Sequence, residues 1–135
     1  MENYDKKVLK RFLNPKFAGE IKNADAVGQV GGAACGDIMR VFLKIEKDKA
    51  GKEKIKDIKF KTMGCVAAIA SSDAVCELAK GKTLEEAKKI TKLDILAKVG
   101  KLPQIKYHCS ILGEEALFEA IKNYENKHQT KNPKK

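Results

Sequence analysis

The hydrophobic residues in the first half of the chain follow first a helical pattern and then a strand pattern. Four of them recur at helical spacing before Asn14-Pro15, where proline ends a helix: Tyr4, Val8, Leu9 and Phe12. Every second residue is hydrophobic from Asp37 to Glu46, and a similar alternation runs from Ile55 to Met63. The polar loop between these two segments contains Gly51. The pattern therefore predicts a short helix and then an antiparallel hairpin, extended to three strands by residues near 27–30.

The second half of the chain predicts helices. The segment from Val66 to Lys80 is rich in alanine and stops at Gly81, a residue that often ends a helix. Thr83 and Glu86 have the spacing of a capping box, which predicts a short helix through Ile90. A further short helix is predicted over 93–99. The last helix is predicted from about Ser110, with four residues facing the core: Leu117, Ala120, Ile121 and Tyr124.

Strands followed by helices are typical of an α+β domain. We therefore expect a small antiparallel three-stranded sheet that is packed on one face by helices, with an N-terminal helix and a long C-terminal helix. The length of 135 residues suits one domain. We expect this domain to span 1–126, followed by a basic flexible C-terminal tail over 127–135.

The net charge of +10 raises the question of a nucleic-acid partner. Most of the lysines alternate with acidic residues, as in Lys47-Asp48-Lys49, and arginine occurs only at Arg11 and Arg40. Alternating charges are typical of a solvated surface, and arginine is the residue that most often reads bases. We therefore expect no nucleic-acid partner.

The termini and the apolar segments indicate where the protein acts. No apolar run approaches the ~20 residues of a membrane span, so we expect no membrane partner. The N-terminal stretch from Met1 to Lys7 is charged and lacks the apolar centre of a secretory signal, which favours a cytoplasmic location. In a reducing compartment cysteines rarely form disulfides, so metal binding and nucleophilic chemistry are the leading interpretations of the four cysteines.

Three of the cysteines lie in loops or at the ends of predicted elements. Cys35 lies in a glycine-rich loop, Cys65 joins a strand to a helix, and Cys109 directly precedes Ser110, the predicted N-cap of the last helix. Unpaired N–H groups at a helix N-terminus favour a thiolate there. Cys76 lies inside a helix among hydrophobic residues, and we interpret it as a core residue.

The spacing of these three cysteines excludes a local zinc finger. Cys35 and Cys65 are 30 positions apart (65 − 35), and Cys65 and Cys109 are 44 apart (109 − 65). A zinc finger needs pairs only a few residues apart. Spacing alone therefore leaves two interpretations open, a metal site assembled by the fold or a sulfur-transfer site.

Three motifs occur in an order and composition that resemble the U-type iron-sulfur scaffold family, which includes IscU and the N-terminal part of NifU. The resemblance covers about residues 4–126. The motifs are Val27-Gly28-x-Val30-Gly31-x-Ala33-Ala34-Cys35-Gly36-Asp37, Phe60-Lys61-Thr62-Met63-Gly64-Cys65-x-Ala67-Ala68-Ile69-Ala70-Ser71-Ser72 and Lys106-x-His108-Cys109-Ser110-Ile111-Leu112.

The resemblance implies a non-enzymatic scaffold that assembles iron-sulfur clusters and a set of residues that hold them. Cys35, Cys65 and Cys109 match the family's cluster cysteines, and Asp37 matches the aspartate that completes the ligand set. Cys109 also matches the acceptor of persulfide sulfur. The cargo is expected to be a [2Fe-2S] cluster, with [4Fe-4S] as the alternative, and zinc is expected to enter the same site during purification.

Two neighbours of Cys109 have expected supporting roles. His108 is either an alternative ligand or a group that orients a ligand, and the bland interpretation is a loop histidine bonded to backbone. Lys106 matches a family lysine that neutralises thiolate or sulfide charge, although most lysines of this chain are simply solvated.

The implied partners are a cysteine desulfurase, an electron donor such as ferredoxin, and apo-proteins that receive the cluster. The family's chaperone-binding segment often has two prolines, whereas Leu102-Pro103-Gln104-Ile105-Lys106 has one, so dependence on an Hsp70-type chaperone is left open. A homodimer that shares the cluster is also left open.

The alternative from another class is a zinc-dependent sulfur acceptor that activates a cysteine desulfurase. In that branch zinc occupies the same three cysteines and the aspartate. It carries an insertion before the third cysteine and lacks the adjacent histidine. The segment is compact here and His108 is present, so we prefer the scaffold.

Overall fold

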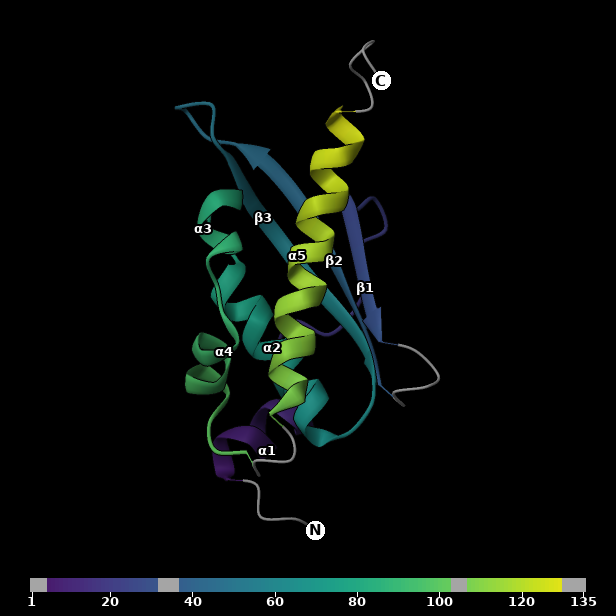
Figure 1. Ribbon diagram of the computed structural model, residues 1–135, viewed down its shortest axis with the longest axis vertical. Coiled ribbons are helices and arrows are strands. Elements are labelled where there is room, and N and C mark those ends of the chain that lie inside the picture. The colour runs from purple at the N-terminus through teal and green to yellow at the C-terminus, as the bar shows by residue number, and fades with distance from the viewer. Residues whose placement is uncertain (1–4, 32–36, 103–106, 130–135) are drawn as a thin grey trace.

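The computed structural model describes residues 5–31, 37–102 and 107–129, which form an α+β domain (Figure 1). The described elements, in chain order, are α1 (Lys6–Leu13), β1 (Ala26–Gly31), β2 (Ile38–Lys47), β3 (Glu53–Met63), α2 (Val66–Ala79), α3 (Leu84–Lys88), α4 (Lys92–Val99) and α5 (His108–Gln129). The predicted fold class is confirmed: one three-stranded sheet precedes the helices that cover it.

The sheet is antiparallel in the order β1-β2-β3, so the predicted hairpin and its third strand are confirmed. β2 pairs with β1 from Ala26↔Leu43 to Gly31↔Ile38, and with β3 from Ile38↔Met63 to Lys47↔Glu53. This register places the start of β2 opposite the end of β3. As a result Asp37, directly before β2, lies near the chain that leaves β3 toward α2.

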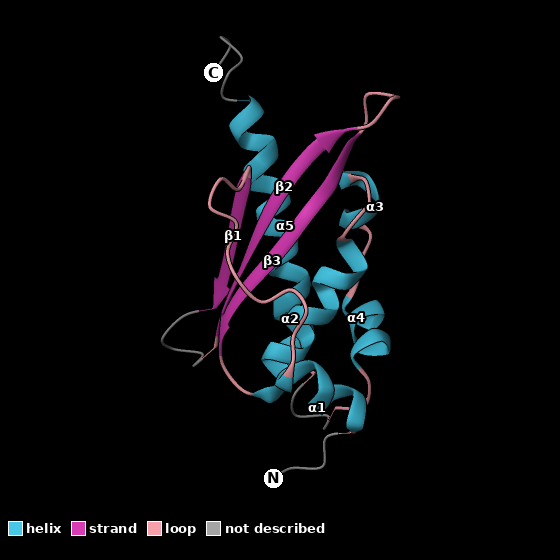
Figure 2. Cartoon of the chain, turned by 180° about the vertical axis from the view of Figure 1, so that it is seen from behind, coloured by secondary structure: helices cyan, strands magenta, loops and turns pink. Residues whose placement is uncertain are grey.

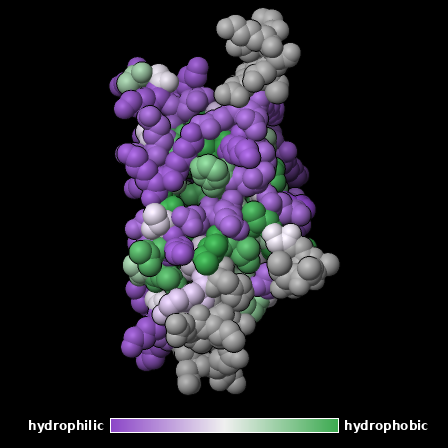
Figure 3. All heavy atoms as spheres, in the orientation of Figure 1, coloured by the Kyte–Doolittle hydropathy of each residue, from purple (hydrophilic) through white to green (hydrophobic). Residues whose placement is uncertain are grey.

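All helices lie on one side of the sheet, as expected (Figure 2). α5 packs on β1 and β2, and α2 packs on β3. The connection from α1 to β1 passes over the other face in Figure 2, and residues 17–19 pair with Phe60 at the outer edge of β3 through two backbone hydrogen bonds of 2.9 Å. Hydrophilic residues cover most of the surface on the helix side (Figure 3).

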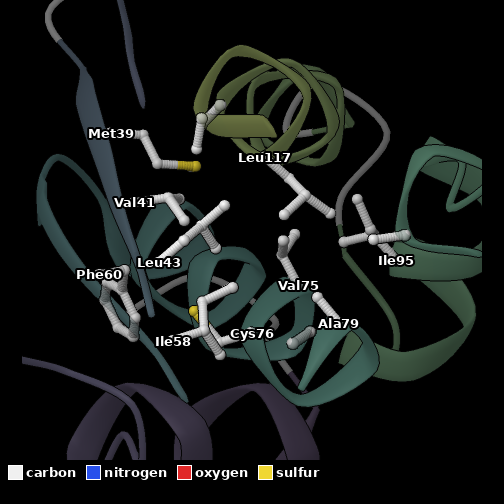
Figure 4. Close-up of a cluster of buried hydrophobic side chains, with 14 of the residues drawn as sticks. Met39, Val41, Leu43, Ile58, Phe60, Val75, Cys76, Ala79, Ile95 and Leu117 are labelled. Atoms are coloured by element: carbon white, nitrogen blue, oxygen red, sulfur yellow. The ribbon is translucent and has the colours of Figure 1, made fainter. Parts of the chain in front are cut away.

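The hydrophobic core lies between the sheet and the helices (Figure 4). The alternation predicted for β2 puts Met39, Val41 and Leu43 completely inside, where they meet residues of α2, α4 and α5. Cys76 is also completely buried, so its interpretation as a core residue is confirmed. Burial raises the pKa of the Cys76 thiol well above its usual range, and the nearby Asp73 charge adds to this.

The buried side of α2 also contains a charged residue that sequence patterns do not explain. The Asp73 side chain is 2% exposed, and its carboxylate accepts a hydrogen bond from Arg11 of α1 at 2.9 Å. It also accepts a hydrogen bond from the backbone N–H of Phe17 at 2.9 Å. A second Arg11 nitrogen pairs with Glu77 at 2.7 Å, and Glu77 also pairs with Lys98 of α4 at 3.1 Å. These ion pairs fasten α1 and α4 to α2.

The helix boundaries in the middle of the chain agree with those predicted from the sequence. The boundaries of the last helix differ from the prediction. The capping box of Thr83 is present, and a second one, which sequence analysis did not predict, starts α4 at Thr91. The last helix begins at His108 rather than about Ser110 and continues to Gln129, so the first three residues of the expected tail are helical. A polar composition does not end a helix when no glycine or proline interrupts it. Residues 130–135 lie outside the described part of the chain.

Candidate metal centre

The structure brings three of the predicted site residues together from three separate parts of the chain. Asp37 precedes β2, Cys65 is the N-cap of α2, and Cys109 lies in the first turn of α5. One carboxylate oxygen and the two sulfurs all lie within 4.8 Å of one another. Two thiols and a carboxylate at this separation form a donor set for one metal ion or one metal cluster.

The distance between the two sulfurs supports this interpretation. The Sγ atoms of Cys65 and Cys109 are 3.9 Å apart. Two sulfurs bound to one tetrahedral ion at 2.3 Å are about 3.8 Å apart. A disulfide would instead require a separation of about 2.05 Å. The thiols therefore have the spacing of two ligands on a common metal ion.

Two glycines make room for Asp37 at this site. A Cβ atom on Gly64 would lie 2.6 Å from Oδ1 of Asp37, so a larger residue would push the carboxylate away. Gly31 has a φ of +88° and passes so close to Asp37 that a Cβ atom there would lie 2.1 Å from the Asp37 carbonyl oxygen. Sequence analysis placed Gly31 in a glycine-rich loop whose backbone can bend toward a ligand, and it assigned Gly64 no role. The sequence signal for the role of Gly64 was its position directly before a cysteine at the end of a strand.

A short hydrogen-bonded chain holds the junction of β3 and α2 in place behind Cys65. The Ser72 hydroxyl donates to the Ala68 carbonyl at 2.7 Å, so the Thr62 hydroxyl is left to donate to Ser72 Oγ, also at 2.7 Å. These bonds tie the last residues of β3 to the first turns of α2. Because Cys65 lies between the two elements, its position is restrained from both sides.

The N-termini of two helices lie at this site. Cys65 caps α2, and no side chain accepts a hydrogen bond as the cap of that helix. Cys109 lies in the first turn of α5, a helix of 22 residues. The positive end of a helix dipole favours negative charge. A metal centre that carries thiolate and sulfide charge is therefore favoured at this position.

Cys109 is more enclosed than its sequence suggests. Sequence analysis placed it in the loop before the last helix, with Ser110 as the N-cap. Instead Cys109 is helical and completely buried, and the Ser110 N–H donates to the Tyr107 carbonyl at 3.0 Å within the first turn. Cys65 and Asp37 are only partly buried. Cys65 is thus more accessible than Cys109, the other described thiol of this site.

Some predicted site residues cannot be placed. Cys35 and Lys106 lie outside the described residues, as do residues 103–106 of the segment 102–106 on which the chaperone prediction depends. His108 is the first residue of α5, and its side chain lies outside the described part of the structure. The roles predicted for these residues stay predictions.

Comparison with known proteins shows the family. The family model described as "NifU-like N terminal domain" matches residues 3–131 of the chain.

The chain belongs to this NifU-like family.

Proteins similar to this member of the NifU-like family include scaffolds from distant organisms. It is 47% identical over 121 residues to iron-sulfur cluster assembly scaffold protein IscU 1 of Archaeoglobus fulgidus, covering 90% of this chain and 76% of the relative. It is also 47% identical over 133 residues to the mitochondrial iron sulfur cluster assembly protein 1 of Debaryomyces hansenii. That alignment covers 96% of this chain and 72% of the relative.

A solved structure shares the fold. A protein of Fervidobacterium islandicum AW-1, with a proposed role as an iron-sulfur cluster assembly scaffold for the SUF system, superposes with a TM-score of 0.70 at 25% identity. The alignment covers 87% of this chain and 96% of that protein. The recognition of the U-type scaffold family from sequence motifs is therefore confirmed.

These comparisons show the family but not the cellular compartment. None of the helices in the described ranges has both the length and the apolar composition needed to cross a bilayer. One of the similar proteins is named as mitochondrial, so the cytoplasmic location stays a prediction.

Proposed function

We propose that this chain is a scaffold on which iron-sulfur clusters are assembled and from which they are passed to apo-proteins, rather than an enzyme. The observation that carries the proposal is the cluster of Asp37, Cys65 and Cys109, whose ligand atoms lie within 4.8 Å of one another. Relatives named as cluster assembly scaffolds support it at 47% identity.

The ligand set suits a cargo better than a permanent cofactor. Thiolates are soft ligands that suit iron-sulfur units, whereas a carboxylate is a harder and more exchangeable ligand. We include Cys35 as the fourth ligand because it matches a cluster cysteine of the family in the motif that also contains Asp37. Three thiolates and one carboxylate can hold a [2Fe-2S] cluster, with [4Fe-4S] as the alternative, and still release it to a protein that offers four thiolates.

Sulfur delivery is proposed to end on Cys109. A thiolate at Cys109 attacks the outer sulfur of a persulfide on a cysteine desulfurase, a new S–S bond forms, and the desulfurase cysteine leaves as a thiolate. Conversion of that outer sulfur to sulfide then takes two electrons, which a donor such as ferredoxin would supply. Mass spectrometry after a short anaerobic exchange is expected to find the extra sulfur on Cys109. Extra sulfur found only on another thiol, such as the more exposed Cys65, would rule out this assignment.

Release is proposed to depend on Asp37. Asp37→Ala removes the exchangeable oxygen ligand, so the variant is expected to purify with more iron and sulfide and to transfer its cluster more slowly than the parent. Both proteins must be loaded equally before transfer is timed. A variant that loses its cluster faster and still delivers it as quickly as the parent would reduce Asp37 to a holding ligand.

Zinc binding is a second candidate, because the sulfur separation of 3.9 Å also fits a tetrahedral zinc site. In that case the chain would accept sulfur and activate a cysteine desulfurase without building a cluster. Bound zinc in purified protein does not separate the two functions, since zinc binds readily to thiolates.

One experiment separates the two candidates. The chain is incubated anaerobically with iron, cysteine and a cysteine desulfurase, and is then examined by absorption and Mössbauer spectroscopy before an apo-ferredoxin is added. A scaffold shows cluster spectra that move to the ferredoxin. A zinc-dependent activator raises desulfurase turnover and forms no cluster, and that result would overturn the proposal.

A further inference from the structure

A groove outside the metal centre lies beside an exposed aromatic residue of α5. Phe118 is 51% exposed, although the neighbouring Leu117 is almost completely buried. The groove has a volume of about 500 Å³ and is lined by Val30 of β1 and by residues of α3, α5 and the chain after α3, including Ala87, Ile90, Glu114, Glu115, Phe118 and Glu119. In Figure 3 hydrophobic surface lies in the middle of this face, with hydrophilic residues around it. An apolar site with a charged rim is typical of a docking surface.

The described lining of the groove contains three glutamates and one lysine, so its charge is opposite to that of the whole chain. Lys122, one turn beyond Phe118, is not part of this lining. Residues 108–121 contain three glutamates and neither lysine nor arginine, in a chain whose net charge is +10. None of the three forms an ion pair with a residue in the described ranges, although Glu20, Asp25, Asp73, Glu77 and Glu125 all do.

The one lysine of the groove does not neutralise these glutamates. Lys88 lines the groove, but its Nζ pairs with Glu125 at 2.5 Å, about two turns of α5 beyond Phe118. Glu115 and Glu119 lie one helical turn apart, and so do Glu114 and Phe118. The rim therefore presents carboxylates at helical spacing beside an apolar centre.

We propose that this groove docks a basic amphipathic helix of a partner protein. An apolar side chain of the partner packs against Phe118, Ala87 and Ile90, while lysines or arginines one turn apart reach the glutamates of the rim. Helix-in-groove binding uses this division between apolar anchors and a polar rim. The acidic rim also directs a basic partner to this groove, because most of the remaining surface is basic and repels such a partner.

A second copy of the chain is a poorer occupant. Two copies with a net charge of +10 each repel one another. A contact between the acidic rim of one copy and a lysine-rich surface of the other would be head-to-tail, which leaves a free site at each end.

The groove is close to the metal centre along the same helix. Cys109 and Phe118 are nine positions apart in α5 (118 − 109), or about 14 Å along the helix axis. A docked partner would therefore lie beside the helix that carries one of the candidate ligands. The docking proposal does not depend on the identity of the cargo.

A designed peptide tests the docking surface. The probe is a fluorescein-labelled amphipathic helix of about 18 residues, with leucine on one face and lysine on the other. Matched peptides replace every lysine by glutamate or every leucine by serine. Fluorescence anisotropy is expected to show binding of the leucine-lysine peptide about tenfold tighter than either matched peptide. Binding should weaken when the salt concentration rises from about 0.05 to 0.3 M.

Variants of the groove locate the binding. Phe118→Ser and Glu115→Lys are each expected to weaken binding about tenfold, because central anchors and rim charges carry most of the energy. The matched controls are Leu13→Ser, which removes another exposed apolar side chain, and Glu46→Lys, which reverses an exposed charge on β2. Both controls should bind like the parent, and circular dichroism should show that all four variants are folded.

Three outcomes would overturn the proposal. The first is no measurable binding of the leucine-lysine peptide. The second is equal weakening by the groove variants and the controls, which indicates nonspecific attraction. The third is a dimer in sedimentation experiments that Phe118→Ser dissociates, because the occupant would then be a second copy of the chain.

Discussion

Cys76 and Cys109 are both completely buried, yet their surroundings differ in chemistry. Cys76 lies in the C-terminal half of α2 among hydrophobic side chains, and burial raises the pKa of its thiol well above the usual range. Cys109 lies at the start of a helix, 3.9 Å from the sulfur of Cys65 and close to the Asp37 carboxylate. Burial alone therefore does not separate a core cysteine from a candidate ligand. A second donor nearby and a position at a helix N-terminus do.

The two ends of α2 also differ in what surrounds their charged and polar side chains. Around Asp73 and Glu77 the carboxylates form ion pairs with Arg11 and Lys98, which connect three helices. At the N-terminal end, Cys65 lies beside two further donors from distant parts of the chain. One end of the helix thus stabilises the fold, and the other end is suited to bind a cargo.

The largest expected effect comes from Arg11→Ala, which leaves the Asp73 carboxylate buried without its guanidinium. The free energy of unfolding is expected to fall by about 3–5 kcal/mol, measured by urea denaturation. Lys61→Ala is the matched control, since it breaks an exposed ion pair with Glu20 and should cost far less. Equal losses for the two variants would show that the Asp73 pair is not a special feature of this end of α2.

Cys76→Ser is expected to have the next largest effect. It places a hydroxyl in the apolar core and should lower the free energy of unfolding by about 1–3 kcal/mol. Cys65→Ser is the control at the other end of α2, where the side chain is partly exposed, and it should cost much less. If Cys65→Ser is as destabilising as Cys76→Ser, the contrast between the two ends is wrong.

Gly64→Ala tests the space that Asp37 occupies at the site. The added methyl group would lie 2.6 Å from Oδ1 of Asp37, so the carboxylate has to move away from the sulfurs. Cluster transfer is expected to slow by up to about tenfold, as in Asp37→Ala. Because Gly64 acts through Asp37, the double variant Asp37→Ala/Gly64→Ala should transfer no more slowly than Asp37→Ala alone. Additive slowing would contradict this mechanism.

The smallest effect is the acid sensitivity of the Glu77 ion pairs. Burial raises the pKa of Glu77, but hydrogen bonds from Arg11 and Lys98 outweigh it and hold the pKa below the ordinary value of 4.5. A lowered pKa contributes stability above the unfolded value of about 4.5, and this contribution is lost as the pH falls through the folded value.

The measurement compares the parent with Glu77→Gln at several pH values. Because Glu77 is partly exposed, its contribution should be less than about 1 kcal/mol at neutral pH and should disappear as the pH falls below 4.5 and through the lowered pKa of the folded state. If the difference in the free energy of unfolding between the parent and Glu77→Gln grows as the pH falls, the ion pairs do not stabilise the charged form of Glu77.

Much of the fold was predictable because its patterns are local. The alternation in β2 and β3, the alanine-rich α2 and the capping box at Thr83 all depend on residues near one another in the sequence. The early start of α5 was missed because tertiary packing, rather than the first polar residue, determines where that helix begins. The role of Asp73 was also missed, since its partner Arg11 is 62 positions away.

The candidate site was predicted from family motifs and not from spacing. Distances of 30 and 44 positions between cysteines carry no geometric information until the fold is known. The register of β2 and β3 then accounts for the approach of Asp37 to Gly64, a contact that no single motif contains.

The most direct test of the account is the amount of cluster that each cysteine variant binds. Iron and acid-labile sulfide per chain are measured after anaerobic reconstitution of the parent, Cys35→Ala, Cys65→Ala, Cys109→Ala and Cys76→Ala. The account predicts that Cys76→Ala binds nearly as much cluster as the parent, while each of the other three variants is impaired. Loss of the cluster in Cys76→Ala, together with normal loading of Cys109→Ala, would contradict it.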